Sequence, residues 1–132
     1  MRIDCDIHPA VPGTASLFPY MSDAWREMSE VRGITDLPSI NYPDNTPLSA
    51  RVDWRPAEGR AATTADGIGR QCLDAFGSDI GILNPLFGIQ TLYADDLAQA
   101  YTAALNDWTR AEFLDRDPRF RASIVIDRKS VV

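Results

Sequence analysis

The sequence lacks any apolar run of the roughly 18 residues that a membrane-spanning helix needs. Its first six residues, Met-Arg-Ile-Asp-Cys-Asp, also lack the apolar core of a secretory signal. These absences predict a cytoplasmic protein that does not enter a membrane. Cysteine is scarce as well: Cys5 and Cys72 form no Cys-x-x-Cys pair and stand among apolar residues, which favours buried thiols in a reducing compartment over a disulfide.

Positive charge is in the minority. Lysine and arginine number 13 against 19 acidic residues, the formal net charge is −6, and the arginines are scattered. Affinity for nucleic acid depends on a basic face, so this balance argues against a nucleic-acid partner. The hydrophobic fraction of 45% and the charged fraction of 24% are typical of a folded globular protein, and we expect a single domain over residues 1–132.

The first strand carries the most informative pattern. Residues 2–8 read as a short strand that ends at Pro9, and side chains alternate between the two faces of a strand. Asp4, Asp6 and His8 should therefore share one face. A carboxylate and an imidazole two residues apart can reach one divalent ion, zinc or alternatively manganese, so Asp6 and His8 are the candidate metal ligands. The alternative is that His8 is an ordinary surface histidine and Asp6 is simply solvated.

The rest of the chain alternates helical and strand patterns. Strands are predicted at 79–84 and 121–126, and helices at 22–31, 63–77 and 93–114. Strand–helix–strand order is typical of a parallel sheet. The fold class is therefore α/β.

A long proline-rich segment follows the first strand. Residues 10–60 are predicted to form an inserted loop or lid with one short helix, leaving the end of the strand that carries Asp6 and His8. Tyr42, Trp54 and Arg55 are then candidates for substrate contact, and Asn84, at the end of the second strand, is another. The alternative explanations are that the aromatic residues anchor the loop and that Asn84 forms a turn before Pro85.

Three stretches of the chain resemble the amidohydrolase superfamily: IDCDIHP, LNPL and NDWTRAEFLDRDPRFRASIVI. Within that superfamily they resemble the amidohydrolase-related branch, which includes aminocarboxymuconate-semialdehyde decarboxylase. The resemblance implies a metal-dependent TIM-type (β/α)8 barrel that hydrolyses or decarboxylates small organic acids. In that family the first strand ends in two metal ligands, usually His-x-His. Asp6 and His8 match those positions, and Asp6 is the departure.

Two further departures limit what the resemblance implies. A complete barrel takes about 250 residues, so the 132 residues here correspond to about the first three strand–helix units. His8 is the only histidine, so the later metal-binding histidines of the family have no counterpart.

Two functions remain open at this stage. The first is a metal-dependent hydrolase or decarboxylase acting on a small carboxylic acid, with aromatic acids among the candidates. The isolated chain would be inactive, and it would be either an N-terminal piece of a longer gene product or a protomer completed by self-association or a partner chain. The second is a non-catalytic α/β fragment that binds a partner chain through open sheet edges.

Overall fold

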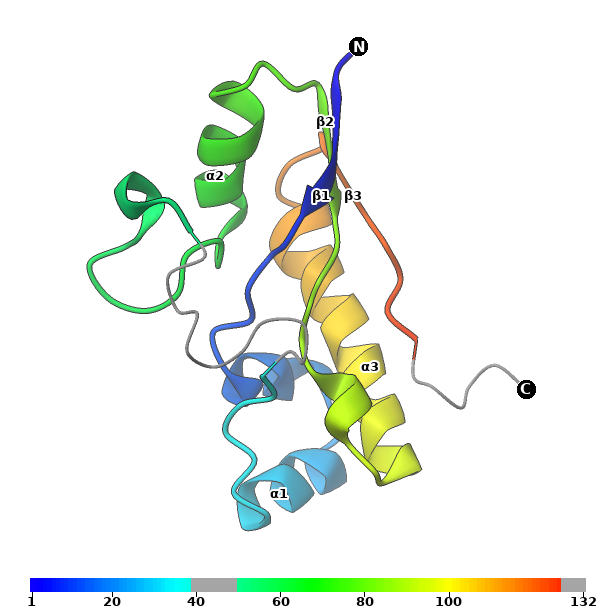
Figure 1. The fold of residues 1–132 in the computed structure, drawn as a ribbon. Coiled ribbons are helices and arrows are strands. Elements are labelled where there is room, and N and C mark those ends of the chain that lie inside the picture. The colour runs from blue at the N-terminus through cyan, green and yellow to red at the C-terminus, as the bar shows by residue number, and fades with distance from the viewer. Residues whose placement is uncertain (39–49, 127–132) are drawn as a thin grey trace.

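A computed structural model of the chain describes residues 1–38 and 50–126. Three parallel strands form one sheet in the order β1 (Ile3–Ile7), β2 (Ile80–Leu83) and β3 (Phe120–Ala122) (Figure 1). The predicted parallel α/β arrangement is confirmed, with the first strand at one edge. The third strand is shorter than predicted, because only its first residues pair with β2.

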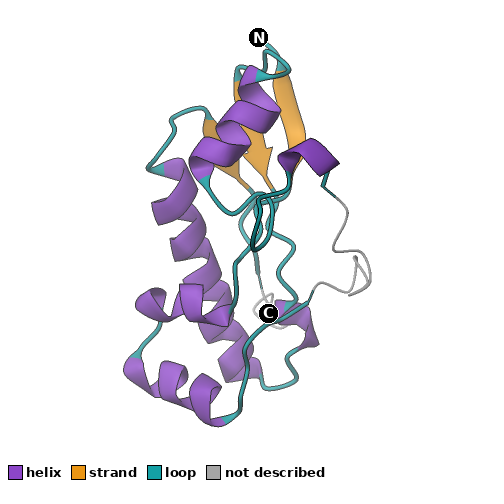
Figure 2. Ribbon diagram, turned by 90° about the vertical axis from the view of Figure 1, so that its left-hand side faces the viewer, coloured by secondary structure: helices purple, strands orange, loops and turns teal. Residues whose placement is uncertain are grey.

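Two long helical segments connect the strands. One comprises α2 (Ala65–Ile68) and a π-helical continuation, η3 (Gly69–Asp74); the other comprises α3 (Asp95–Thr109) and a π-helical continuation, η5 (Arg110–Leu114). Figure 2 shows both against the strands. The predicted helix over 63–77 is therefore shorter at both ends, and Phe76, which lies beyond its observed end, is half exposed.

The segment after β1 is more structured than a loop. It contains the 3-10 helix η1 (Thr14–Tyr20), helix α1 (Asp23–Val31) and the short 3-10 turn η2 (Val52–Trp54), while η4 (Ile89–Thr91) follows β2. Helix α1 confirms the predicted short helix. Figure 1 shows η1 and α1 beyond the carboxyl ends of the strands.

Backbone hydrogen bonds tie this segment to the chain after β2. The Thr14 amide donates to the Thr35 carbonyl at 3.2 Å, and the Gly88 amide donates to the Leu37 carbonyl at 2.9 Å. A Cβ at position 88 would lie 2.1 Å from the Pro38 carbonyl oxygen, so only glycine allows this approach. The described part of the segment is thereby fixed over the strand ends.

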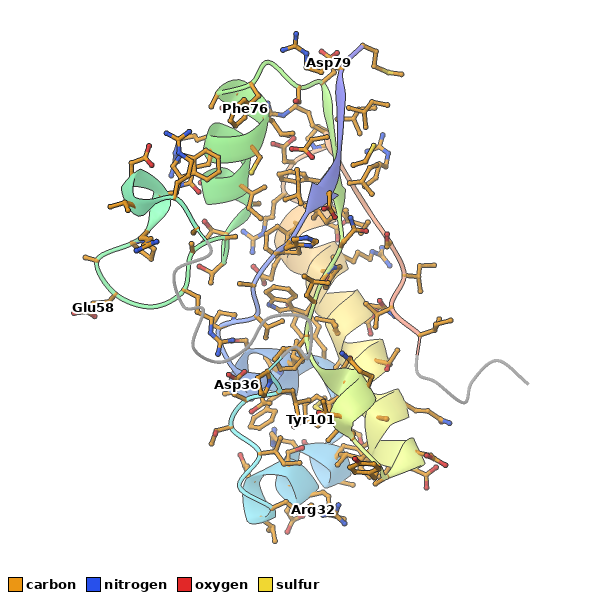
Figure 3. All side chains as sticks on the ribbon, in the orientation of Figure 1. Arg32, Asp36, Glu58, Phe76, Asp79 and Tyr101 are labelled. Atoms are coloured by element: carbon orange, nitrogen blue, oxygen red, sulfur yellow. The ribbon has the colours of Figure 1, made fainter. Side chains whose placement is uncertain are left out.

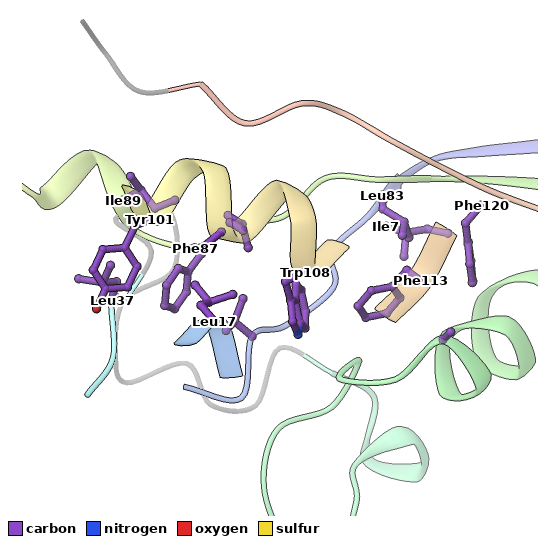
Figure 4. Packing of buried hydrophobic residues seen from close by; sticks show 14 of the residues in the cluster. Ile7, Leu17, Leu37, Leu83, Phe87, Ile89, Tyr101, Trp108, Phe113 and Phe120 are labelled. Atoms are coloured by element: carbon purple, nitrogen blue, oxygen red, sulfur yellow. The ribbon is translucent and has the colours of Figure 1, made fainter. Parts of the chain in front are cut away.

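One hydrophobic core extends along α3. Every third or fourth residue of α3 is buried, as its sequence periodicity predicts. Figure 4 shows Tyr101 beside Leu37 toward one end of this helix, with Leu17 next along it. Trp108 and Phe113 follow toward Phe120 and the sheet. The ring centroids of Trp108 and Phe113 are 5.2 Å apart in an edge-to-face arrangement. The helix therefore joins the sheet to the region beyond its carboxyl ends.

Asn106 holds the chain that follows β3. Its side-chain nitrogen donates to the Val125 carbonyl at 2.8 Å, and its side-chain oxygen accepts from the Val125 amide at 3.0 Å. This pair of bonds mimics one step of a β-ladder and holds Val125 against α3, whereas the Ser123 amide still donates to the Leu83 carbonyl of β2. Ile124 and Ile126, on either side of Val125, are exposed.

Across residues 1–38 and 50–126, no helix has both the length and the apolar character that crossing a membrane requires.

Candidate metal-binding site

A β-bulge in β1 decides which side chains share a face. Asp4 lies opposite Gly81 and Ile7 lies opposite Leu83, so β1 has one more residue than β2 over this span. The Asp4 carboxylate accepts a hydrogen bond from the Asp6 amide at 3.2 Å, an Asx-type turn that fits the bulge. Asp4 and Ile7 therefore face the same side, the side covered by the helices.

The expectation that Asp4 shares a face with Asp6 and His8 is thus wrong. Strict alternation fails where an extra residue enters the strand. Burial raises the pKa of the Cys72 thiol on η3, and the negative charge of Asp4 raises it further, which agrees with Asp4 facing that helix. Ile7 is almost fully buried in the core on the same side.

Asp6 and His8 lie together at the carboxyl end of β1. The distance from His8 Nε2 to Asp6 Oδ1 is 3.4 Å. The Asp6 side chain is 79% exposed and that of His8 is 32% exposed, so water reaches this pair. When the imidazole is protonated, the contact is an ion pair. When the imidazole is neutral, His8 Nε2 and Asp6 Oδ1 could both act as ligand atoms to one cation.

The second ring nitrogen of His8 has a backbone partner. His8 Nδ1 lies 3.0 Å from the carbonyl oxygen of Asn84. A carbonyl oxygen only accepts hydrogen bonds, so this contact is a hydrogen bond when Nδ1 carries the proton; in the neutral ring Nε2 then carries the lone pair. A histidine that binds a metal commonly donates its other N–H to a carbonyl or carboxylate in this way.

Asn84 joins the carboxyl ends of all three strands. Its amide donates to the Ile7 carbonyl at 2.7 Å, and its side-chain nitrogen donates to the Cys5 carbonyl, at the bulge, at 2.9 Å. Its side-chain oxygen accepts from the Ser123 hydroxyl at 2.5 Å, just after β3. Both ends of the side-chain amide are therefore engaged with neighbouring strands, and a direct contact with substrate stays a prediction.

The donor geometry of Asp6 and His8 suits a divalent ion. Two ligand atoms that each lie 2.0–2.2 Å from a tetrahedral zinc are about 3.3–3.6 Å apart. The 3.4 Å between Nε2 and Oδ1 falls in that interval. Among residues 1–38 and 50–126, no cluster of three or more histidine, cysteine or acidic side chains could hold a metal. The pair therefore offers two potential ligand atoms, Nε2 and Oδ1.

Trp54, another candidate substrate contact, lies away from Asp6 and His8. Trp54 packs edge-to-face on Phe76, with ring centroids 6.1 Å apart, and its carbonyl accepts from the Gln71 side chain at 3.3 Å. Figure 3 shows Phe76 at the same end of the molecule as Asp79, which precedes β2, whereas Asp6 and His8 lie at the opposite end of β1. Trp54 thus anchors its segment to the helix, as the alternative explanation held.

Arg55 stabilises the same turn, since its Nε donates to the Ala50 carbonyl at 2.9 Å. Tyr42 lies outside the residues that the structure describes.

Ser123 is the residue of this site that we did not identify from sequence. Its hydroxyl contacts Asn84, the residue that contacts His8. Its position offered a signal: a polar residue follows the buried part of β3, just as Asn84 follows β2, and the carboxyl ends of neighbouring parallel strands meet at one edge of a sheet.

No protein-family model matches the chain, and no curated protein matches it. The relationship to the amidohydrolase superfamily therefore stays a prediction from the sequence motifs.

Proposed function

We propose that the chain provides the first-strand half of a divalent-metal site in a hydrolase or decarboxylase of amidohydrolase type, acting on a small organic carboxylate. The observation that supports it most is the 3.4 Å spacing between His8 Nε2 and Asp6 Oδ1, combined with the hydrogen bond from His8 Nδ1 to Asn84. Zinc is the expected ion, and manganese is the alternative.

The arrangement of the sheet supports a partial (β/α) barrel over a doubly wound fold. The strands neighbour one another in sequence order, and residues of η3 and η5 pack on one face: Leu73 lies against the backbone of Gly81, and Phe113 lies against Phe120. A barrel keeps its helices on the outer face, whereas a doubly wound sheet has helices on both faces. Asp6 and His8 would then face the barrel interior.

In this proposal Asp6 and His8 hold the ion, and the ion would supply Lewis acidity and an acidified water. Catalytic zinc normally has three protein ligands, so further ligands would come from a partner chain or from residues outside those described. The isolated chain is then expected to bind zinc weakly and to have no turnover.

Zinc titration calorimetry tests the proposal. The wild-type chain should bind one ion weakly, and His8→Ala and Asp6→Asn should each abolish saturable binding. Asp4→Asn is the matched control: simple alternation would place Asp4 in the site, but the bulge turns it away, so this variant should bind like the wild type. Equal binding by the wild type and His8→Ala would refute the site.

Assays on aromatic and enol carboxylates, with and without added zinc, test the second half of the expectation. With two protein ligands the bound water is only partly acidified, so no turnover is expected. Turnover by the wild type that disappears in His8→Ala would mean that this chain completes the site alone.

A second function, binding a further copy of the chain, is favoured by the sheet edges. Strands β1 and β3 each pair only with β2 among the described residues, and exposed apolar side chains lie on or beside them: Ile3, Ile124 and Ile126. Such edges recruit another strand. Sedimentation equilibrium should show a mass that rises with concentration, and a constant monomer mass would exclude this interface.

A further inference from the structure

We propose that Asn84 and Ser123 are positioning residues that hold His8 as the Nδ1–H tautomer, so that its Nε2 lone pair lies on the side of Asp6. This inference deepens the proposed metal site, but its first test requires no metal. It assigns a role to Ser123, which the sequence motifs do not mark, and it gives Asn84 a role other than substrate contact.

The first step of the argument concerns the acceptor. The imidazole can place its neutral-state proton on either nitrogen, and neighbouring hydrogen bonds decide which. His8 Nδ1 faces the Asn84 carbonyl oxygen at 3.0 Å, and that oxygen cannot donate. A proton on Nε2 would point toward Asp6 Oδ1, but that contact is 3.4 Å long and the Asp6 carboxylate is 79% exposed to water. The Nδ1 contact, at 3.0 Å, has the length of an ordinary hydrogen bond, so this geometry favours the Nδ1–H form.

The second step concerns what fixes that carbonyl. The Asn84 backbone amide and side-chain nitrogen both bond to β1, through the carbonyls of Ile7 and Cys5. Both residues lie around the bulge that turns Asp4 away from the face shared by Asp6 and His8. The two bonds thus hold the Asn84 carbonyl at a set position relative to the His8 ring.

The third step concerns the orientation of the Asn84 amide. A side-chain amide can rotate and exchange its oxygen and nitrogen, and only one orientation lets the nitrogen donate to Cys5. The Ser123 hydroxyl donates to the amide oxygen at 2.5 Å, while the Ser123 backbone amide bonds to the Leu83 carbonyl at 2.9 Å. The Cys5 carbonyl, which only accepts, selects this orientation. The Ser123 hydroxyl, by donating to the amide oxygen, holds the Asn84 side chain there and joins β3 to β2 and β1 at the site.

The test is nitrogen-15 NMR of the histidine ring in the metal-free chain. His8 is the only histidine, so the spectrum contains a single imidazole. At about pH 9, well above the ordinary imidazole pKa of about 6.5, the wild type should show a protonated Nδ1 and an unprotonated Nε2. Ser123→Ala and Asn84→Ala should move both nitrogen shifts toward the average of two exchanging tautomers.

Matched variants separate positioning from a general loss of structure. Ser123→Thr keeps the hydroxyl and should keep the wild-type shifts. Ser22→Ala removes a serine whose side chain makes no capping hydrogen bond, and it should also match the wild type. A wild-type spectrum with the proton on Nε2 would overturn the inference, as would wild-type shifts in folded Ser123→Ala.

Zinc affinity then distinguishes this inference from the proposed function. Ser123→Ala should weaken zinc binding by about tenfold, the lower end of the range for residues that orient a metal ligand. If the nitrogen shifts behave as expected but neither the wild type nor any variant binds zinc, the metal site is refuted and the positioning role of Asn84 and Ser123 stands. Zinc binding by a wild type that shows averaged shifts would refute the positioning pair alone.

Discussion

Gly81 lies on β2 where neighbouring side chains approach the backbone closely. A Cβ at this position would lie 2.7 Å from the Ile7 Cδ1 atom and 3.0 Å from a Leu73 methyl. Close packing of this kind leaves no room for an added methyl group without displacing neighbours. The absence of a side chain at position 81 thus allows η3 to pack closely against β1 and β2.

We expect Gly81→Ala to lower the free energy of unfolding by about 1–3 kcal/mol, the usual cost of overpacking a core. Urea denaturation measures this. Ile7→Val removes the nearest clashing atom, so the double variant should be more stable than the sum of the two single changes predicts. Additive losses would show that the added methyl group does not meet Ile7.

At the residue scale, sequence alternation predicted that Asp6 and His8 share a face, and they lie 3.4 Å apart. It could not predict that Asp4 leaves that face, because the bulge depends on register against β2, a strand more than 70 residues away. The hydrogen bond from Ser123 to Asn84 depends likewise on how β2 and β3 lie side by side.

Among the elements, η3 and the start of β3 are joined by an arginine between two aspartates. Arg119 donates to Asp117 through two guanidinium nitrogens, Nε and Nη2, and to Asp74 through Nη1 at 2.6 Å. The hydrogen bonds from Arg119 hold the pKa of Asp117 below its ordinary value of 3.8, and the hydrogen bonds that Asp117 and Asp74 accept raise the pKa of Arg119. This cluster links the helix to the amino end of the third strand.

Arg119→Gln should lower the free energy of unfolding by about 1 kcal/mol at neutral pH, since the lost contacts are charge-assisted but partly exposed. Because the pKa of Asp117 is lower in the folded state, its stabilisation is fully present above about pH 4 and is lost as the pH falls through the folded-state pKa. Denaturation between pH 2 and 7 should therefore show a shallower acid slope for the variant.

Arg110→Gln is the matched control for this prediction. Arg110 makes only a 3.7 Å contact with Asp115 at an exposed position, so its loss should change neither the stability nor the acid slope appreciably. An acid slope in Arg119→Gln equal to that of the wild type would contradict the proposed role of the cluster.

The elements themselves were predictable where packing follows local periodicity. The apolar spacing from Leu97 to Trp108 predicted α3, and the apolar run before Asn84 predicted β2. The 3-10 helix η1 was missed because Pro19 and the preceding Pro12-Gly13 indicate a loop. Its position depends on tertiary contacts such as the hydrogen bond between Thr14 and Thr35.

Over the whole molecule, the carboxyl ends of the strands are where segments distant in sequence converge. The chain after β1, the chain after β2 and Ser123 after β3 meet there. The strand–helix–strand pattern predicted this convergence, because parallel strands end at one edge. Which residues join the strand ends, here Asn84 and Ser123, depends on contacts between the strands, and local sequence patterns do not encode those contacts.

The most direct measurement is an anomalous difference map at the zinc edge from a crystal of the chain soaked in zinc. We expect one peak between Asp6 and His8, about 2.0–2.2 Å from both His8 Nε2 and Asp6 Oδ1, with His8 Nδ1 still on the Asn84 carbonyl. A peak bound through Nδ1, or zinc only at other carboxylates, would contradict the proposal that the first strand carries the metal site.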